Sequence, residues 1–174
     1  MEEERNIWCM NLKDRRPEGG RNRDEELKFR RCLEKSVVAI GWCVPDDVHT
    51  WEEYREIADK TYAGKDGYKT AVKALGGMRS GDLVWVKKPK DDVYILAEIV
   101  DNYPDINLFL REFDICAYRR VRFYPDSDKE RSKYAALTSD RLKARHTAEC
   151  MGMEKRGETY SATLDLYENM KRCY

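Results

Sequence analysis

The sequence is poor in several features that would point at once to a class of protein. Its 174 residues contain two histidines, and 33 Lys and Arg are matched by 33 Asp and Glu, which leaves no net charge. A protein that attracts polyanions through its overall charge is therefore excluded, although a local basic patch is not. No apolar run approaches the length of a membrane span, and the first residues, MEEERN, are acidic rather than a basic leader. We expect a cytoplasmic protein that makes no membrane contact.

Signatures of metal sites and disulfides are also lacking. The six cysteines show no CxxC motif and no paired Cys/His spacing; they are Cys9, Cys32, Cys43, Cys116, Cys150 and Cys173. Neither a zinc site nor a disulfide framework is indicated, so we expect reduced thiols, no metal and no cofactor. His49 and His146 lie far apart in the sequence, which gives a Cys/His nucleophile pair no support.

Catalytic motifs are missing as well. The sequence has no P-loop, no GxSxG and no HExxH motif. The segment DVYILAEIVD offers Glu98 and Asp101, but no lysine follows at the spacing that a metal-dependent nuclease needs. We therefore predict that the protein is not an enzyme.

Charge is nevertheless uneven along the chain. Residues 46–59 carry six acids and one base, whereas residues 111–145 carry ten bases and six acids. Two basic clusters, KDRRPEGGRNR in a Pro- and Gly-containing loop and AYRRVRFY in a predicted strand, could neutralise phosphates. Solvated helix faces explain the uneven charge equally well, and a solvated loop explains the first cluster equally well. In AYRRVRFY, alternation puts Arg120 and Arg122 on one face, so at least one arginine pair is expected to face solvent or ligand.

Hydrophobic patterning predicts a small α+β domain. Strands are expected at 6–12, 36–42, 82–88, 92–100 and 113–123, and helices at 24–35, 50–62, 67–78 and 158–172. Thr50 is the predicted N-cap of the second helix, and Gly76 or Gly77 is predicted to end the third. This order fits a small, curled, mixed β-barrel with helices packed outside it, over residues 1–125. Residues 126–174 are expected to form a helical extension packed on the same domain.

Three tryptophans occupy comparable places in the predicted strands. Trp8 lies inside the first strand, Trp42 ends the second, and Trp85 lies inside the third, in GGMRSGDLVWVKK. If these strands are neighbours, the rings could converge on a pocket for a planar ligand. Trp85 and Lys87 share one face of their strand, and because an unpaired lysine is costly to bury, Trp85 is expected at the mouth of that pocket. The alternative is that the aromatic rings simply fill a small core.

The order of four segments resembles a known family. The motifs IWCMNLK, SVVAIGW, MRSGDLVWVKK and YILAEIVD are similar to those of the PUA-like superfamily, and most similar to EVE-like domains of bacterial restriction systems. The resemblance covers residues 6–123. It implies a PUA-like barrel that binds nucleic acid, and EVE and YTH relatives hold a modified base in an aromatic pocket. In contrast to that pattern, KKPKDD replaces a short glycine turn, and the last 50 residues match nothing in the family.

Carried over by position, the resemblance implies a set of ligand-binding residues: Trp8, Asn11, Trp42, Ser80 and Trp85. Asn11 and Ser80 could contact a base edge. Phosphate binding is expected at Lys13, Arg15, Arg16, Lys87, Arg119, Arg120 and Arg122. Gly81 and Asp82 are expected to have a structural role in a turn.

Two classes of function follow from these residues. The first is a nucleic-acid-binding module, for DNA rather than RNA, that reads a plain or modified base in a phage-defence or restriction context. The second is a protein-interaction or inhibitor module in which the barrel is a scaffold and the acidic stretch 46–59 docks a basic partner.

Overall fold

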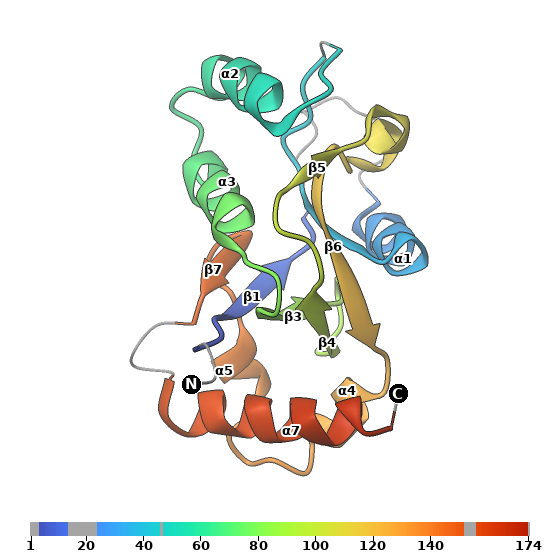
Figure 1. The fold of residues 1–174 in the computed structure, drawn as a ribbon, viewed down its shortest axis with the longest axis vertical. Coiled ribbons are helices and arrows are strands. Elements are labelled where there is room, and N and C mark those ends of the chain that lie inside the picture. Colours follow the sequence, from blue (N-terminus) through green and yellow to red (C-terminus); the bar gives the residue numbers. More distant parts are fainter. Residues whose placement is uncertain (1–3, 14–23, 46, 152–155, 174) are drawn as a thin grey trace.

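The computed structural model describes residues 4–13, 24–45, 47–151 and 156–173. It shows a mixed α+β protein whose sheet is strongly curled into a half-barrel, with helices packed against it (Figure 1). The predicted combination of a curled mixed sheet and outer helices is confirmed.

Within the described part of the chain, seven strands form the sheet. They are β1 (Ile7–Asn11), β2 (Val37–Ile40), β3 (Leu83–Lys87), β4 (Tyr94–Ile99), β5 (Asp105–Ile106), β6 (Ala117–Tyr124) and β7 (Ala148–Cys150). Their order is β2-β6-β4-β3-β1-β7, and β5 pairs with β6 beside this path. β1 and β3 run parallel, whereas the other described pairs are antiparallel. The five predicted strands correspond to β1, β2, β3, β4 and β6, and the short strands β5 and β7 were not predicted.

Helices flank the sheet on both sides. The longer ones are α1 (Glu25–Lys35), α2 (Trp51–Thr61), α3 (Tyr68–Gly77) and α7 (Ser161–Lys171). The shorter ones are η1 (Leu108–Phe113), α4 (Ser127–Arg131), α5 (Ser139–Leu142) and η2 (Arg156–Tyr160). α2 begins as predicted at Thr50, whose hydroxyl accepts a hydrogen bond from Glu53 N at 3.1 Å while the Glu53 carboxylate accepts from Thr50 N. This reciprocal capping box satisfies amide groups that the first helical turn leaves without partners.

The end of α3 differs from the prediction. Gly76 and Gly77 lie within its last turn, and the C-cap is Met78 in extended backbone. A Cβ atom at Gly76 would lie 3.3 Å from the Trp51 ring, and one at Gly77 would lie 3.5 Å from the Trp8 ring. These glycines therefore allow two indoles to approach the helix and do not terminate it.

Each face of the sheet carries its own hydrophobic core. Val84 and Val86 of β3 pack in the core that also receives side chains of α1, α2 and α3. Leu83 and Trp85 point the other way, into a second core that includes Leu166 of α7. The alternation along β3 is as predicted. α7 covers the face of β3 that carries Trp85, where the mouth of a pocket was expected.

The C-terminal segment is part of this architecture. β7 pairs antiparallel with β1, in the register Trp8↔Cys150, and so adds an edge strand to the sheet. The predicted helical extension thus contains, besides α4, α5, η2 and α7, a strand that was not predicted. A three-residue strand is too short to stand out in a polar segment, and its position depends on pairing with β1.

Candidate nucleic-acid interface

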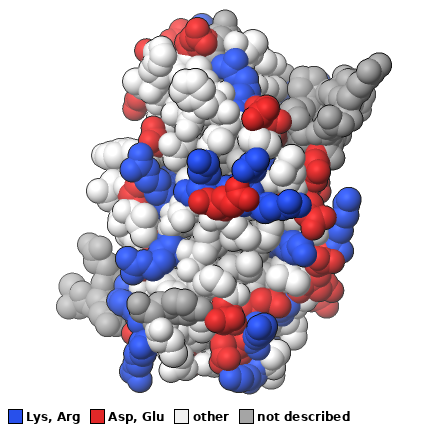
Figure 2. Space-filling view, turned by 90° about the vertical axis from the view of Figure 1, so that its right-hand side faces the viewer, with Lys and Arg blue, Asp and Glu red and all other residues white. Residues whose placement is uncertain are grey.

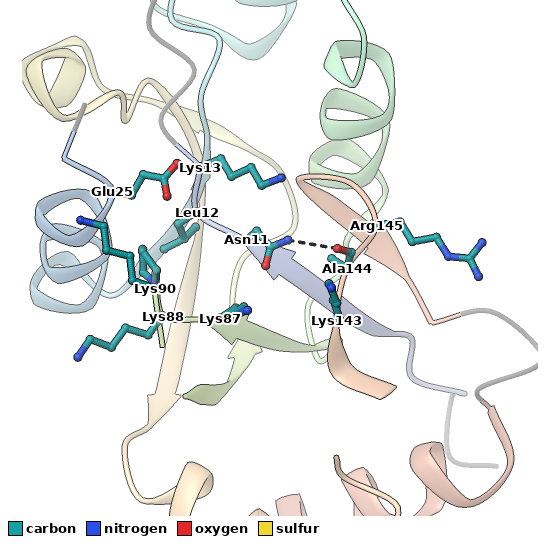
Figure 3. Close-up of a pocket in the computed structure, with 11 residues that line it drawn as sticks. Asn11, Leu12, Lys13, Glu25, Lys87, Lys88, Lys90, Lys143, Ala144 and Arg145 are labelled. Atoms are coloured by element: carbon teal, nitrogen blue, oxygen red, sulfur yellow. Dashed lines mark hydrogen bonds between the residues drawn. The ribbon is translucent and has the colours of Figure 1, made fainter. Parts of the chain in front are cut away.

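The most basic pocket of those described lies where the two parallel strands end. β1 and β3 pair in the register Asn11↔Lys87, so their carboxyl ends meet at one edge (Figure 3). The pocket has a volume of about 340 Å³. We call it the basic groove; its lining residues are Asn11, Leu12, Lys13, Glu25, Lys87, Lys88, Pro89, Lys90, Lys143, Ala144 and Arg145.

Positive charge dominates this lining. Six of the lining residues are Lys or Arg, and Glu25 is the single acidic residue in the lining. Two lysines have acidic neighbours in the β3-β4 turn, Lys87 at 3.7 Å from Asp92 and Lys88 at 2.9 Å from Asp91. The hydrogen bond to Asp91 raises the pKa of Lys88. Exposed pairs of this kind contribute little and are weakened by salt, so an anion can compete for the lysines.

Asn11 lies in the middle of the groove, at the end of β1. Its Nδ2 donates to Ala144 O at 3.3 Å and to His146 O at 3.5 Å. Two carbonyl oxygens on one side fix the orientation of the amide, because a flip would place its oxygen against them. Oδ1 then points away from them, is buried, and has no hydrogen-bond partner among the described residues. The groove thus contains an unused acceptor beside its cations.

A buried tyrosine, Tyr94, lies beside Lys87 at one wall of the groove. Tyr94 of β4 pairs with Lys87, and the ammonium of Lys87 lies 5.7 Å from the centre of its ring. Burial raises the pKa of Tyr94 to about 12. The ring is therefore neutral and presents its face to the ammonium of Lys87 at the edge of the groove.

The structure brings only some of the predicted site residues together. Asn11, Lys13 and Lys87 all line the basic groove. Ser80 lies at the opposite end of β1 and β3, in a pocket of about 690 Å³ that also includes Asp82. Asn11 and Ser80 therefore do not face one ligand.

At that opposite end, Gly81 and Asp82 form the predicted turn. Gly81 adopts a φ of 89°, which a residue with a side chain rarely does. The buried carboxylate of Asp82 accepts from Asn6 N at 3.0 Å, from Trp8 Nε1 at 2.9 Å and from Arg79 N at 3.0 Å. These bonds connect the turn to the start of β1, which confirms a structural role.

The three tryptophans do not form an open aromatic pocket. Trp8 and Trp42 are 9% and 7% exposed and belong to the first core, whereas Trp85 is fully buried in the second. The Trp85 indole donates to Thr163 Oγ1 at 3.1 Å, on the buried side of the sheet. The prediction that Trp85 lies at a mouth shared with the other two is therefore wrong. Lys87 reaches solvent two residues further on although Trp85 does not, because β3 ends there.

One of the predicted phosphate-binding arginines is buried. Arg119 has no exposed side-chain surface, and its Nε lies 2.6 Å from Asp101 Oδ1. Its other nitrogens donate to the carbonyl oxygens of Leu75, Met78 and Asp101. Arg119 thus connects β6 to the end of α3, and its assignment to phosphate binding is wrong.

The remaining predicted cations lie elsewhere. Arg120 is exposed and pairs with Asp105 at 3.1 Å, and Arg122 is exposed on the same strand. Both lie on β6. In the β4-β6 register Arg122 is opposite Glu98, which in turn is opposite Leu83, the first residue of β3, so these arginines lie at the end of the sheet away from the groove. Figure 2 shows the face that carries α1 and β6, where Lys and Arg are mixed with Asp and Glu. Arg15 and Arg16 lie outside the described residues.

Several cations of the groove were not among the predicted site residues: Lys88, Lys90, Lys143 and Arg145. The run KKPK was a usable signal for the first two, because it directly follows a predicted strand. No signal in the sequence placed Lys143 and Arg145 beside Asn11. Their position follows from β7, which brings the preceding residues to the end of β1.

Within the described ranges, no three His, Cys, Asp or Glu side chains gather closely enough to hold a metal ion. The helices described there also lack the combination of length and apolar character needed to cross a bilayer.

A family model described as a domain of unknown function (DUF8426) matches residues 8–137. The match extends over most of the chain, from β1 through α4, so the protein belongs to this family. The three groove residues from Lys143 to Arg145 lie beyond the matched range. No curated protein and no solved structure matches the chain.

Proposed function

We propose that this protein is a nucleic-acid-binding module of the PUA-like type and that phosphates bind in the basic groove. The observation that carries the proposal is the cluster of six Lys and Arg side chains around a pocket of about 340 Å³ with one carboxylate. A chain with no net charge attracts nucleic acid only through such a local cluster. The proposed role is binding without catalysis.

Asn11 gives the groove a means of contacting more than phosphate. Its buried, unsatisfied acceptor can bond an amino or hydroxyl group of a nucleotide once the atoms that cover it move as the ligand enters the groove. Because Trp8, Trp42 and Trp85 are buried, base contact in this proposal occurs at Asn11 and not in an aromatic pocket. The resemblance to EVE-like domains makes DNA, plain or modified, the first ligand to test, and a role in restriction or phage defence is proposed on that resemblance alone.

Fluorescence anisotropy with short labelled oligonucleotides tests the proposal. Single-stranded and duplex DNA, the same DNA with modified bases, and the matching RNA are titrated with protein at several salt concentrations. In the triple variant Lys13→Gln, Lys88→Gln, Lys90→Gln, we expect affinity to fall at least about tenfold and the salt slope to fall by about two to three, because three phosphate contacts are lost.

A matched control removes three exposed cations outside the groove: Lys73→Gln, Arg120→Gln and Arg122→Gln. We expect this variant to bind like the unchanged protein. Equal losses in both triple variants would show that binding is diffuse, and unchanged binding in the groove variant would refute the proposed site. Absence of binding to every oligonucleotide would refute the function.

The alternative, a protein-interaction module, depends on the acidic stretch at α2. Its described carboxylates are exposed, but several are already used within the helix: Glu53 in the capping box, Glu56 with Lys60 at 3.0 Å, and Asp59 with Arg55 at 3.5 Å. These exposed pairs weaken its attraction for a basic partner. The nucleic-acid proposal is therefore preferred.

A further inference from the structure

The edge of β6 is only partly paired. β2 pairs with residues 117–120 of β6, and the last bond on this side runs from Val121 N to Ser36 O at 2.9 Å. β6 continues to Tyr124. On its other side, Arg120 O accepts from Val100 N at 3.0 Å, so the backbone groups of Arg120 and Arg122 point toward β4. By alternation, those of Val121 and Phe123 point toward the β2 side.

Phe123 therefore presents its backbone outward beyond the end of β2. Its N–H and C=O form no hydrogen bond with any other described residue on that side. A donor and an acceptor from one extended residue form the pattern that a further antiparallel strand recognises.

An apolar hollow lies beside this unpaired edge. It has a volume of about 650 Å³ and is lined mainly by Leu33, Ile95, Val100, Val121, Phe123 and Pro125. A second pocket of about 310 Å³ adjoins it and shares Ser36, Val100 and Val121. Val100 is 46% exposed, which is unusual for a large apolar side chain in this molecule. We call the two pockets together the β6 edge groove.

The charges around the β6 edge groove are of one sign. Lys35, Arg120 and Arg122 are among its lining residues, and no Asp or Glu is. Arg120 pairs with Asp105 outside the lining, whereas Lys35 and Arg122 form no ion pair with any described residue. The face in Figure 2 is mixed in sign as a whole, so this restriction to cations is local. A partner complementary to the groove carries carboxylates.

We infer that the β6 edge groove binds an extended segment of a partner protein in which apolar residues alternate with Asp or Glu. The backbone of the segment pairs with Phe123 and lengthens the sheet beyond β2. Because side chains of a strand alternate, one set enters the apolar hollow while the other reaches Arg122 and Lys35. A nucleic acid fits this surface less well, since its charged backbone has no apolar groups at strand spacing to fill the hollow beside Phe123. This site is separate from the basic groove and does not depend on nucleic-acid binding.

A library of random linear peptides displayed on phage, selected on the full chain, tests the inference. Selected peptides are synthesised with a fluorescent label, and their affinity is measured by anisotropy. We expect them to share an alternating apolar and acidic pattern and to shift the Phe123 amide signal in ¹H-¹⁵N spectra. Phe123→Pro removes the outward N–H, which the ladder to β4 does not use, and Arg122→Glu reverses the charge at the rim.

Each of these variants should weaken binding by about tenfold or more, because backbone pairing and charge complementarity both contribute. Lys73→Glu, an exposed charge reversal on α3, is the matched control and should bind normally. If Phe123→Pro proves unfolded by its amide spectrum, Arg122→Glu alone decides. The inference is overturned if selection enriches no related family, if enriched peptides lack acidic residues, or if they bind Arg122→Glu as tightly as the unchanged protein. Displacement of the peptides by short DNA would assign the surface to nucleic acid instead.

Discussion

The two ends of the parallel pair β1 and β3 use charged residues in opposite ways. At the amino end, the Asp82 carboxylate is 4% exposed and accepts three hydrogen bonds shorter than 3.1 Å from Asn6, Trp8 and Arg79. At the carboxyl end, lysines surround an open groove, and two of them, Lys87 and Lys88, pair with exposed acids of the β3-β4 turn. Buried, fully bonded charges hold elements together, whereas exposed like charges repel one another and favour a bound anion.

Arg119 and Arg120 repeat the comparison within a single strand. Arg119 is buried at the amino end of β3, bonded to Asp101 and to the end of α3. Arg120 is next to it on β6, but its side chain is 63% exposed beside Asp105. The environment, not the residue type, decides whether an arginine stabilises the fold or remains available to a ligand.

Replacing Arg119 should have the largest effect. Arg119→Leu removes the guanidinium partner of the Asp101 carboxylate, which keeps only the Arg120 N–H, and leaves the carbonyl oxygens of Leu75 and Met78 without that donor. We therefore expect the free energy of unfolding to fall by about 3 to 5 kcal/mol. Arg120→Leu loses one exposed ion pair and should cost at most about 1 kcal/mol. Urea unfolding measures the free energy of unfolding of each variant. Similar losses in the two variants would contradict the distinction between a buried structural arginine and an exposed one.

Asp82 should come next. Asp82→Ala removes the acceptor for Trp8 Nε1 and two backbone amides, and we expect a loss of about 3 kcal/mol because buried donors are left unsatisfied. Asp82→Asn keeps the size and one acceptor oxygen and should lose less. The same denaturation experiment compares them; a neutral Asp82→Ala would contradict the structural role of the amino end.

Alkaline pH should weaken the fold by a smaller amount through its buried tyrosines. Burial raises the pKa of Tyr94 to about 12, above the value of about 10 that an unfolded chain has. Below pH of about 10, Tyr94 is neutral in both states and its contribution is intact; as pH rises toward 12, only the unfolded state loses the proton and stability falls. Tyr94→Phe should make the decline between these pH values less steep. Urea unfolding curves collected across this pH range measure the decline for both proteins. The same dependence of the free energy of unfolding on pH in Tyr94→Phe and in the unchanged protein would contradict the expectation.

Removal of the groove lysines should have the least effect on the fold. Lys13→Gln, Lys88→Gln and Lys90→Gln together should change the free energy of unfolding by less than about 0.5 kcal/mol, because partly or fully exposed side chains away from the core contribute little. A slight increase in the free energy of unfolding is also consistent with this account, because the substitutions relieve repulsion between like charges. A loss comparable to that of Asp82→Ala would mean that the groove is a structural feature, like the amino end.

The local elements of the fold could be predicted because each has a local cause. Thr50 and Glu53 mark the start of α2 by their spacing, and alternation along DLVWV correctly separates Leu83 and Trp85 from Val84 and Val86. What alternation cannot say is which face is covered. Trp85 is buried because α7, more than seventy residues later in the chain, packs on its side of the sheet.

The candidate site was predictable only in part, for the same reason. Asn11 and Lys87 follow from the ends of two strands, but Lys143 and Arg145 reach the groove through long-range pairing of β7 with β1. Burial of Arg119 likewise depends on Asp101 and α3, not on the motif AYRRVRFY. Contacts between distant segments are set by tertiary packing, which spacing within a motif does not contain.

Backbone amide shifts on addition of a short single-stranded DNA test most directly whether the carboxyl end of the β1 and β3 pair is the ligand-binding end. We predict that the largest ¹H-¹⁵N shifts occur at Asn11, Lys87, Lys88 and Lys90 and in the segment 143–145, and that they decrease with salt. Residues 79–82 at the amino end should stay unperturbed. Shifts concentrated at residues 79–82, or none in the basic groove at saturation, would contradict the account.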